Sequence, residues 1–148
     1  MTSYEIIQIL SGTVGALCFS ILFNVRGNHL YVSSLGGFLS WFMFVIFSRF
    51  TNSEVLSYFL VALFITAYCE IMARLVKAPT TTFIMPSLVP LIPGASLYYT
   101  MTSAFSGDVS LFTGKAVYTF ELSSALALGV IIASAVFKMF FKIRRRHS

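Results

Sequence analysis

The stretch Lys77–Tyr99, KAPTTTFIMPSLVPLIPGASLYY, decides how this chain folds. It is apolar enough to lie in a membrane, yet it contains helix-breaking residues at Pro79, Pro86, Pro90, Pro93 and Gly94. Each proline removes a backbone donor and clashes with the preceding turn, so the stretch predicts an interrupted helix. Irregular backbone at membrane depth persists where protein covers it or where it lines a wet cavity. An interrupted apolar segment therefore points to a transport site.

The overall composition indicates an all-α integral membrane protein. Of the 148 residues, 57% are hydrophobic and only 10% are charged, whereas a soluble domain has roughly 25% charged residues. The net charge of +5 is also that of many nucleic-acid-binding proteins, but half of the ten Lys and Arg residues fall within 138–146, after the last apolar run. We therefore predict a protein of the lipid bilayer and no nucleic-acid partner.

The apolar runs predict a single membrane domain over residues 1–148, with about five transmembrane helices and the fourth broken by Pro and Gly. Each span needs roughly 20 apolar residues. A loop is expected over 106–115, and whether the fourth segment crosses fully or is re-entrant stays open. The predicted spans are 6–23, 30–48, 55–76, 80–104 and 116–137, followed by a basic cytoplasmic tail over 138–148.

The distribution of basic residues predicts the orientation of these spans. With five spans and the N-terminus outside, Arg49 and Lys115 fall on the outer side, and the other eight Lys and Arg residues fall inside. Positive residues favour the cytoplasmic side. We predict a multi-pass protein of the cell (inner or plasma) membrane with the N-terminus outside and the C-terminus in the cytoplasm.

Ionisable residues within spans are costly, and each is a functional hypothesis. Glu70 and Arg74 are four residues apart, so they share one helix face and can pair. Glu70 is either a proton-coupling or gating carboxylate, or one half of a structural pair near the inner headgroups. Glu121 is either an outer proton acceptor or a carboxylate solvated near the outer interface. The proton-coupling candidates are Glu70, Arg74 and Glu121.

Polar residues cluster around the prolines of the fourth segment. The threonines after Pro79 could cap a helix start, satisfy backbone freed by proline or face a polar substrate. Ser96 follows a point where a second half-helix could begin, and free N–H groups there favour a carboxylate. Lys77 is either an inner anchor or attracts an anionic substrate, and Tyr98 can serve in an aromatic belt. The substrate-path candidates are Lys77, Pro79, Thr80, Thr81, Thr82, Pro86, Pro90, Pro93, Gly94, Ser96 and Tyr98.

The sequence contains no recognisable catalytic or metal-binding pattern. Cys18 and Cys69 lie inside apolar segments without a CxxC spacing, so neither a disulfide nor a metal site is predicted. The chain lacks a Gly-rich phosphate loop, a nucleophile elbow and an HExxH motif. We predict that the protein is not an enzyme and uses no cofactor.

The fourth segment, KAPTTTFIMPSLVPLIPGASLYYTM, closely resembles the signature of the threonine/serine exporter family, in its C-terminal half. Residues 12–41, GTVGALCFSILFNVRGNHLYVSSLGGFLSW, look like the first two spans of that half. The likeness covers most of the chain, and this half stands alone as the small subunit of a split exporter. The matching motif positions are Pro79, Thr80, Thr81, Phe83, Pro86, Pro90, Leu91, Pro93, Gly94 and Tyr98.

The resemblance implies a secondary transporter that exports a small polar carboxylate metabolite, either threonine and serine or a succinate-like dicarboxylate. It also implies a second membrane subunit that resembles the N-terminal half of the family. The alternative is a non-transporting membrane scaffold or assembly subunit, which the small-residue stripes would serve equally well. The interrupted fourth segment disfavours a scaffold, because a scaffold has no need of irregular backbone in lipid.

Overall fold

The computed structural model describes the backbone of residues 3–146, and all secondary structure over that range is helical. Three long helices come first and are followed by an interrupted segment and a very long last helix. The elements are α1 (Ser3–Leu22), α2 (Asn28–Phe50), α3 (Glu54–Leu75), α4 (Thr81–Leu88), the short 3₁₀ helix η1 (Val89–Leu91), α5 (Gly94–Phe105) and α6 (Val109–Arg146). This architecture confirms the prediction of an all-α protein.

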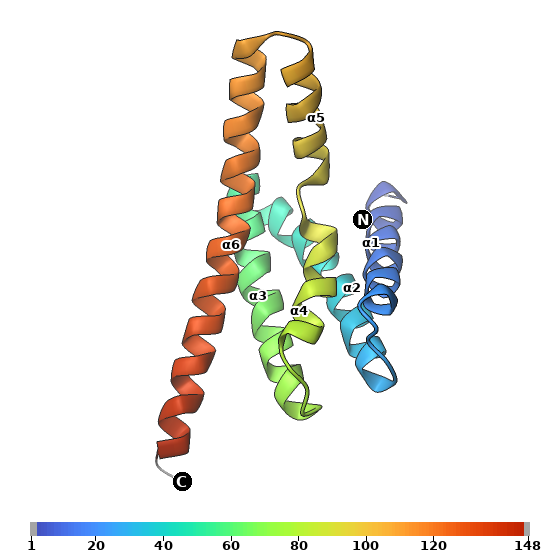
Figure 1. The fold of residues 1–148 in the computed structure, drawn as a ribbon, viewed down its shortest axis with the longest axis vertical. Coiled ribbons are helices and arrows are strands. Elements are labelled where there is room, and N and C mark those ends of the chain that lie inside the picture. Colours follow the sequence, from blue (N-terminus) through green and yellow to red (C-terminus); the bar gives the residue numbers. More distant parts are fainter. Residues whose placement is uncertain (1–2, 147–148) are drawn as a thin grey trace.

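The first four helices and the lower part of α6 form a bundle (Figure 1). Helix α2 packs against α1, α3 and α4, whereas α6 packs along α3. Three glycines, Gly36, Gly37 and Gly129, bring helices into close contact. A Cβ atom added at Gly37 would lie 2.0 Å from the Cβ of Ala16, and one at Gly129 would lie 2.6 Å from the Cβ of Ala62. The bundle is therefore held by small residues at helix crossings, as is common for helices in lipid.

Four helices of this structure are long and apolar enough to cross a membrane: α1, α2, α3 and α6. The pair Thr81–Leu91 and Gly94–Phe105 provides a fifth crossing if its two parts count as one span bent by 56°. Helix α4 starts beside the end of α3, and α5 continues away from that end rather than returning to it (Figure 1). The two parts thus follow one another along the molecule and do not fold back on each other (Figure 1).

The prediction of a loop over 106–115 is wrong for most of that range, because α6 already begins at Val109. Gly107 has a φ of +76°, which allows the tight turn after α5. Asp108 then caps the new helix, since its Oδ1 accepts a hydrogen bond of 3.0 Å from the Leu111 amide. The polar residues that suggested a loop lie on the first turns of α6 instead.

Helices α5 and α6 form a hairpin that projects beyond the other helices (Figure 1). At about 1.5 Å per residue, the 38 residues of α6 extend roughly 57 Å, whereas the 22 residues of α3 extend roughly 33 Å. Helix α6 also continues through the basic stretch that was expected as a tail. Helix α5 packs mainly against α6, so the two halves of the broken segment have different surroundings.

Candidate functional site at the broken fourth segment

The fourth segment is interrupted over residues 89–93, which we call the break. Helix α4 contains Pro86 but continues to Leu88, so this proline does not end it. The turn η1 follows, and Ile92 then takes an extended conformation, which is the usual one for a residue before proline. Pro93 precedes the first residue of α5, where its missing N–H leaves no helical bond unmade. The predicted interruption is therefore confirmed, and it lies at the last two prolines.

Helix α4 is fixed to α2 by an unusually close contact. A Cβ added at Gly36 would lie 2.0 Å from Oγ of Ser87, so no side chain fits there without movement. The Ser87 hydroxyl donates a 3.4 Å hydrogen bond to the carbonyl oxygen of Ser33. The Ser33 hydroxyl in turn accepts one of 2.9 Å from Ser20 of α1. These serines are fully buried and join three helices at the level of α4.

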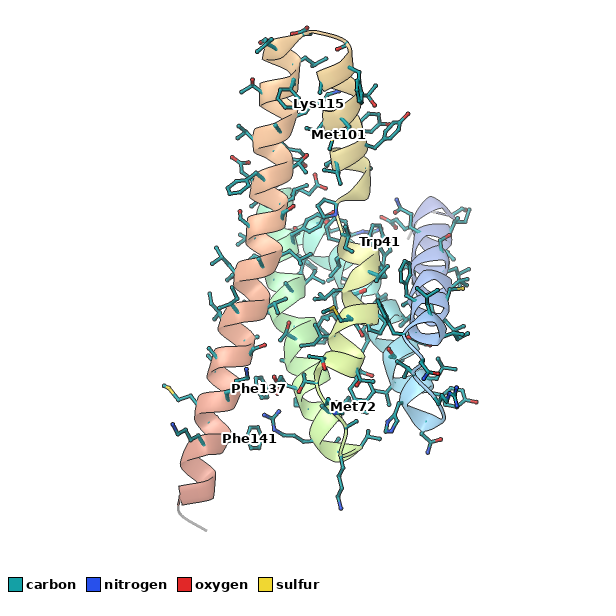
Figure 2. The ribbon with its side chains drawn as sticks, viewed as in Figure 1. Trp41, Met72, Met101, Lys115, Phe137 and Phe141 are labelled. Carbon is teal, nitrogen blue, oxygen red and sulfur yellow. The ribbon has the colours of Figure 1, made fainter. Side chains whose placement is uncertain are left out.

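An open cavity of about 340 Å³, the Pro90 cavity, lies where the break meets α1 and α2. It is lined by Ile7, Gln8, Ser11, Gly12, Trp41 and Pro90. A Cβ built on Gly12 would lie 3.4 Å from the Cβ of Pro90, so the break sits near the middle of α1. The indole Nε1 of Trp41 is buried without a hydrogen-bond partner, and Figure 2 shows this residue next to the break. A buried indole donor without a partner favours a polar ligand or water nearby.

The approach to α4 is formed by the turn after α3. Lys77 has a φ of +55° and is exposed, and the Ala78 amide donates a 2.9 Å hydrogen bond to the carbonyl oxygen of Ala73. This is the left-handed turn that commonly ends a helix. Pro79 is exposed within the same turn. The Lys77 side chain therefore does not pack into the bundle, and its charge lies at the protein surface near the end of α3.

The threonines that follow Pro79 do not cap α4 with their side chains. Thr80 is the N-cap residue, yet its hydroxyl makes no capping hydrogen bond. Its carbonyl oxygen accepts hydrogen bonds of 3.1 Å and 3.0 Å from the amides of Phe83 and Ile84. Thr81 is exposed and Thr82 is half-buried. The capping interpretation is therefore wrong for Thr80, and its hydroxyl is left for other partners.

On the other side of the break, α5 begins at Gly94, so Ser96 lies in its first turn, as expected. Ser96 accepts a 2.8 Å hydrogen bond at its carbonyl oxygen from the Thr100 hydroxyl. Gly94 and Tyr98 are exposed, with 66% of the Tyr98 side-chain surface accessible. Ser96 and Tyr98, the two polar candidates beyond the break, thus lie on α5 outside the packed bundle, whereas Pro86 lies within the bundle.

Glu70 and Arg74 form the expected ion pair, with 2.6 Å between Nη1 and Oε2. Glu70 is buried, and the Arg74 guanidinium lies 3.9 Å from the ring centroid of Phe141 and 5.9 Å from that of Phe137. Both rings belong to α6, as Figure 2 shows. Cation–π contacts of this kind tie α3 to the lower part of α6.

The ion pair lies on a different face of α3 from the one that contacts the broken segment. Arg74, the partner of Glu70, lies over Phe137 and Phe141 of α6, and at about 100° per residue Glu70 is about 100° from Cys69 and about 140° from Ile65 around α3. The face that meets α4 instead carries Ile65 and Cys69, which cluster with Phe83 and Leu91. The structure thus places Glu70 between α3 and α6, away from the break.

Glu121 lies on an exposed part of α6. It lines a shallow groove between the start of α3 and α6, and this groove does not include the break. The groove residues are Ser53, Val55, Leu56, Phe59, Glu121, Ser124, Ala125 and Leu128. None of the three proton-coupling candidates lines the Pro90 cavity beside the break.

Sequence reasoning missed several residues that surround the break. Gln8, Ser11 and Trp41 line the Pro90 cavity, and Ser33 and Ser87 hold α4 in place. One signal was present: residues 33, 36, 37 and 40 of α2 are all small and share one helical face. The spacing of these residues does not predict which helix packs on that face of α2, because α1 and α4 both contact it.

Comparison with known proteins gives one match. Residues 8–136 match the family model described as "Threonine/Serine exporter, ThrE", which covers most of the chain. No curated protein and no solved structure matches the chain.

Proposed function

This chain belongs to the threonine/serine exporter family, and we propose that it is one membrane subunit of a secondary transporter that exports a small carboxylate metabolite. The family assignment supports a multi-pass membrane protein of a transporter family rather than an enzyme. The substrate class, the second subunit and the substrate path are our proposals. The substrate would be threonine or serine, or a dicarboxylate such as succinate.

The observation that carries the proposal is irregular backbone halfway along the bundle. Pro90 lies against Gly12 and Trp41, near the midpoints of α1 and α2. Broken helices at this depth recur where transporters bind their substrates. The Pro90 cavity adjoins the break and is lined in part by Gln8 and Ser11, so polar groups of a substrate would find both space and polar side chains there. In a scaffold this irregular backbone would have no role.

The exposed side of the break supports a second membrane subunit. Ile92 has 59% of its side-chain surface exposed, and Gly94 is exposed as well. Lipid cannot supply hydrogen bonds to irregular backbone, so such backbone is normally covered by protein or by a water-filled cavity. We propose that a second subunit, resembling the N-terminal half of the family, covers this side and completes the path.

The positions of the basic residues support the proposed orientation. The turn between α3 and α4, which contains Lys77, and the end of α6 lie at one end of the molecule, and Lys115 lies toward the other (Figures 1 and 2). If the end with more positive charges faces the cytoplasm, the N-terminus is outside. Lys77 would then stand at the inner mouth beside Thr80 and Thr81.

The proposal is tested by metabolite efflux from cells. Efflux of threonine, serine and succinate is measured together in wild-type cells and in cells that lack this gene. The same measurement is made on the deletion strain after it receives this chain alone, the candidate second subunit alone, or both. We expect loss of one efflux on deletion and its return only when both subunits are present. Unchanged efflux of all three would overturn the transport assignment and favour the scaffold alternative.

The role of the break is tested with the prolines themselves. Pro90→Ala and Pro93→Ala together should let α4 and α5 approach a continuous helix, because a donor returns at each position. We expect efflux to fall to the level of the deletion while the protein still reaches the membrane. Thr80→Val serves as a milder change at the inner mouth, and normal efflux in the double proline variant would exclude the break as the substrate path.

A further inference from the structure

A second cavity lies beyond the break, between α5 and α6. Its volume is about 350 Å³, which is enough for a small metabolite. We call it the Lys115 pocket. It is lined by Ser96 and Tyr99 of α5 and by Lys115, Tyr118 and Thr119 of α6. From the sequence, Lys115 is predicted only to lie on the outer side, and Tyr99 is not among the candidate site residues.

The two walls of the pocket are fixed to each other by a buried hydrogen bond. The hydroxyls of Thr100 and Thr119 are 2.9 Å apart, and both residues are buried. Each hydroxyl also lies within hydrogen-bonding distance of a backbone oxygen one turn earlier, 2.8 Å from Thr100 to Ser96 and 2.9 Å from Thr119 to Lys115. Because a hydroxyl has one hydrogen, one threonine donates to the other while the second donates to its backbone oxygen, and these contacts hold α5 and α6 at a set spacing.

The ammonium of Lys115 is the charged group of the pocket. Its Nζ lies 5.3 Å from the ring centroid of Tyr99, and the residue is half-buried. Figure 2 shows Lys115 between α6 and α5. Among the residues that the structure describes, no acidic side chain forms an ion pair with it. A half-buried ammonium with three donors and no counterion attracts an anionic oxygen group.

The α6 wall also carries a tyrosine whose hydroxyl is already occupied. Tyr118 donates a short hydrogen bond to Glu54 at the start of α3. This bond holds the Tyr118 ring at the pocket wall and joins α6 to the bundle. The rings of Tyr99 and Tyr118 give the pocket an apolar lining around a single cation. Such a lining suits a small molecule whose carboxylate meets Lys115 and whose carbon skeleton packs between the rings.

We propose that the Lys115 pocket binds the carboxylate of a small metabolite. That this metabolite is also the exported one rests on the proposed function, whereas the binding itself rests on Lys115 and the two walls. An anionic lipid headgroup would offer a similar negative oxygen, so the experiment has a separate arm for lipid.

The first test measures binding by calorimetry, with the full chain purified in an uncharged detergent. Succinate and L-threonine are titrated in one arm, and phosphatidylglycerol in mixed micelles in the other. Lys115→Gln should weaken carboxylate binding about tenfold or more, because a charge-assisted hydrogen bond is lost. Lys115→Arg should retain binding. Lys138→Gln, an exposed lysine of the same helix, is the matched control and should leave it unchanged.

The second test needs only the wild-type chain and covers the case in which Lys115→Gln does not fold. Acylation of lysines is followed by mass spectrometry, with and without succinate or L-threonine. We expect the ligand to slow the modification of Lys115 but not that of Lys138. Equal rates with and without ligand, undiminished binding in Lys115→Gln, or protection by phosphatidylglycerol alone would each overturn the proposal.

These experiments measure binding and not transport, so their result can overturn the Lys115 pocket without bearing on the proposed export function. Binding that depends on Lys115 in a protein without any efflux phenotype would keep the pocket and remove the exporter assignment. Efflux that requires both subunits but shows no dependence of binding on Lys115 would do the reverse.

Discussion

The two halves of the broken segment differ in how they are held. Helix α4 is enclosed by α1, α2 and α3, and its Ser87 fits against Gly36 with no room for another atom. Helix α5 leaves the bundle and packs mainly against α6, with Tyr98 and Phe105 largely exposed. Helix α4 is thus a fixed part of the protein core, whereas α5 packs on one side and leaves its other side exposed.

This difference indicates which helices of the protein are free to move and which have a face that a partner could cover. Close contacts between small residues have little freedom to adjust, because a shift of one helix forces a shift of its neighbour. A hairpin joined to the bundle through a single helix has fewer constraints. The break separates the two kinds of surroundings, with the Pro90 cavity beside it and the Lys115 pocket farther along α5 and α6. The predictions below test this contrast.

The largest effect is expected at the contact between α2 and α4. Gly36→Ala should destabilise the protein by about 2 kcal/mol, because the new methyl group would overlap Ser87. Thermal unfolding in detergent measures the change. Adding Ser87→Gly should recover part of the loss, because it removes the atoms in conflict. Gly15→Ala is the control, since nothing lies within 4 Å of a Cβ there, and a loss of equal size in this variant would contradict the proposed tight contact.

The next largest effect is expected at the ion pair between α3 and α6. Glu70→Gln should cost about 1–2 kcal/mol, less than for a fully buried pair because a third of the Arg74 side chain is exposed. Efflux and unfolding are measured in Glu70→Gln, in Arg74→Gln and in the double variant.

The double variant separates the two interpretations of Glu70. If the pair is structural, the double variant recovers stability and efflux relative to Glu70→Gln. If Glu70 carries protons, the double variant stays inactive even when it is stable. The position of the pair beside Phe141, away from the break, leads us to expect recovery.

A smaller effect is expected within the hairpin. Thr100→Val and Thr119→Val each remove one side of a single hydrogen bond between α5 and α6. A double-mutant cycle should give a coupling energy of about 0.6 kcal/mol, the average for such bonds in membrane helices. Carboxylate binding in the Lys115 pocket should weaken in both variants, because the walls lose their fixed spacing. A coupling as large as the loss in Gly36→Ala would show that the hairpin is held as firmly as α4.

An effect of similar size but opposite sign is expected at the turn between α3 and α4. Lys77→Gly should stabilise the protein by about 0.5–1 kcal/mol, because glycine adopts the positive φ of this position without strain. Efflux should nevertheless fall if the Lys77 charge attracts the substrate. Thermal unfolding and efflux of the same variant are compared, and a rise in both would exclude an electrostatic role for Lys77.

The sequence by itself determined the membrane class, the helical fold and the place of the break. These properties follow from local chemistry: long apolar runs require helices in lipid, and proline removes a donor wherever it stands. The family resemblance, carried by the same stretch, was confirmed over residues 8–136. The loop over 106–115 was misread because the capping role of Asp108 was overlooked among other polar residues.

Only the tertiary structure decided which helix faces meet. Lipid is as apolar as a protein core, so hydropathy does not distinguish a face that packs from a face that meets lipid. For this reason the sequence could pair Glu70 with Arg74 but could not turn them toward Phe141 of α6. The Pro90 cavity and the Lys115 pocket likewise arise from residues far apart in the chain, which come together only when the helices pack.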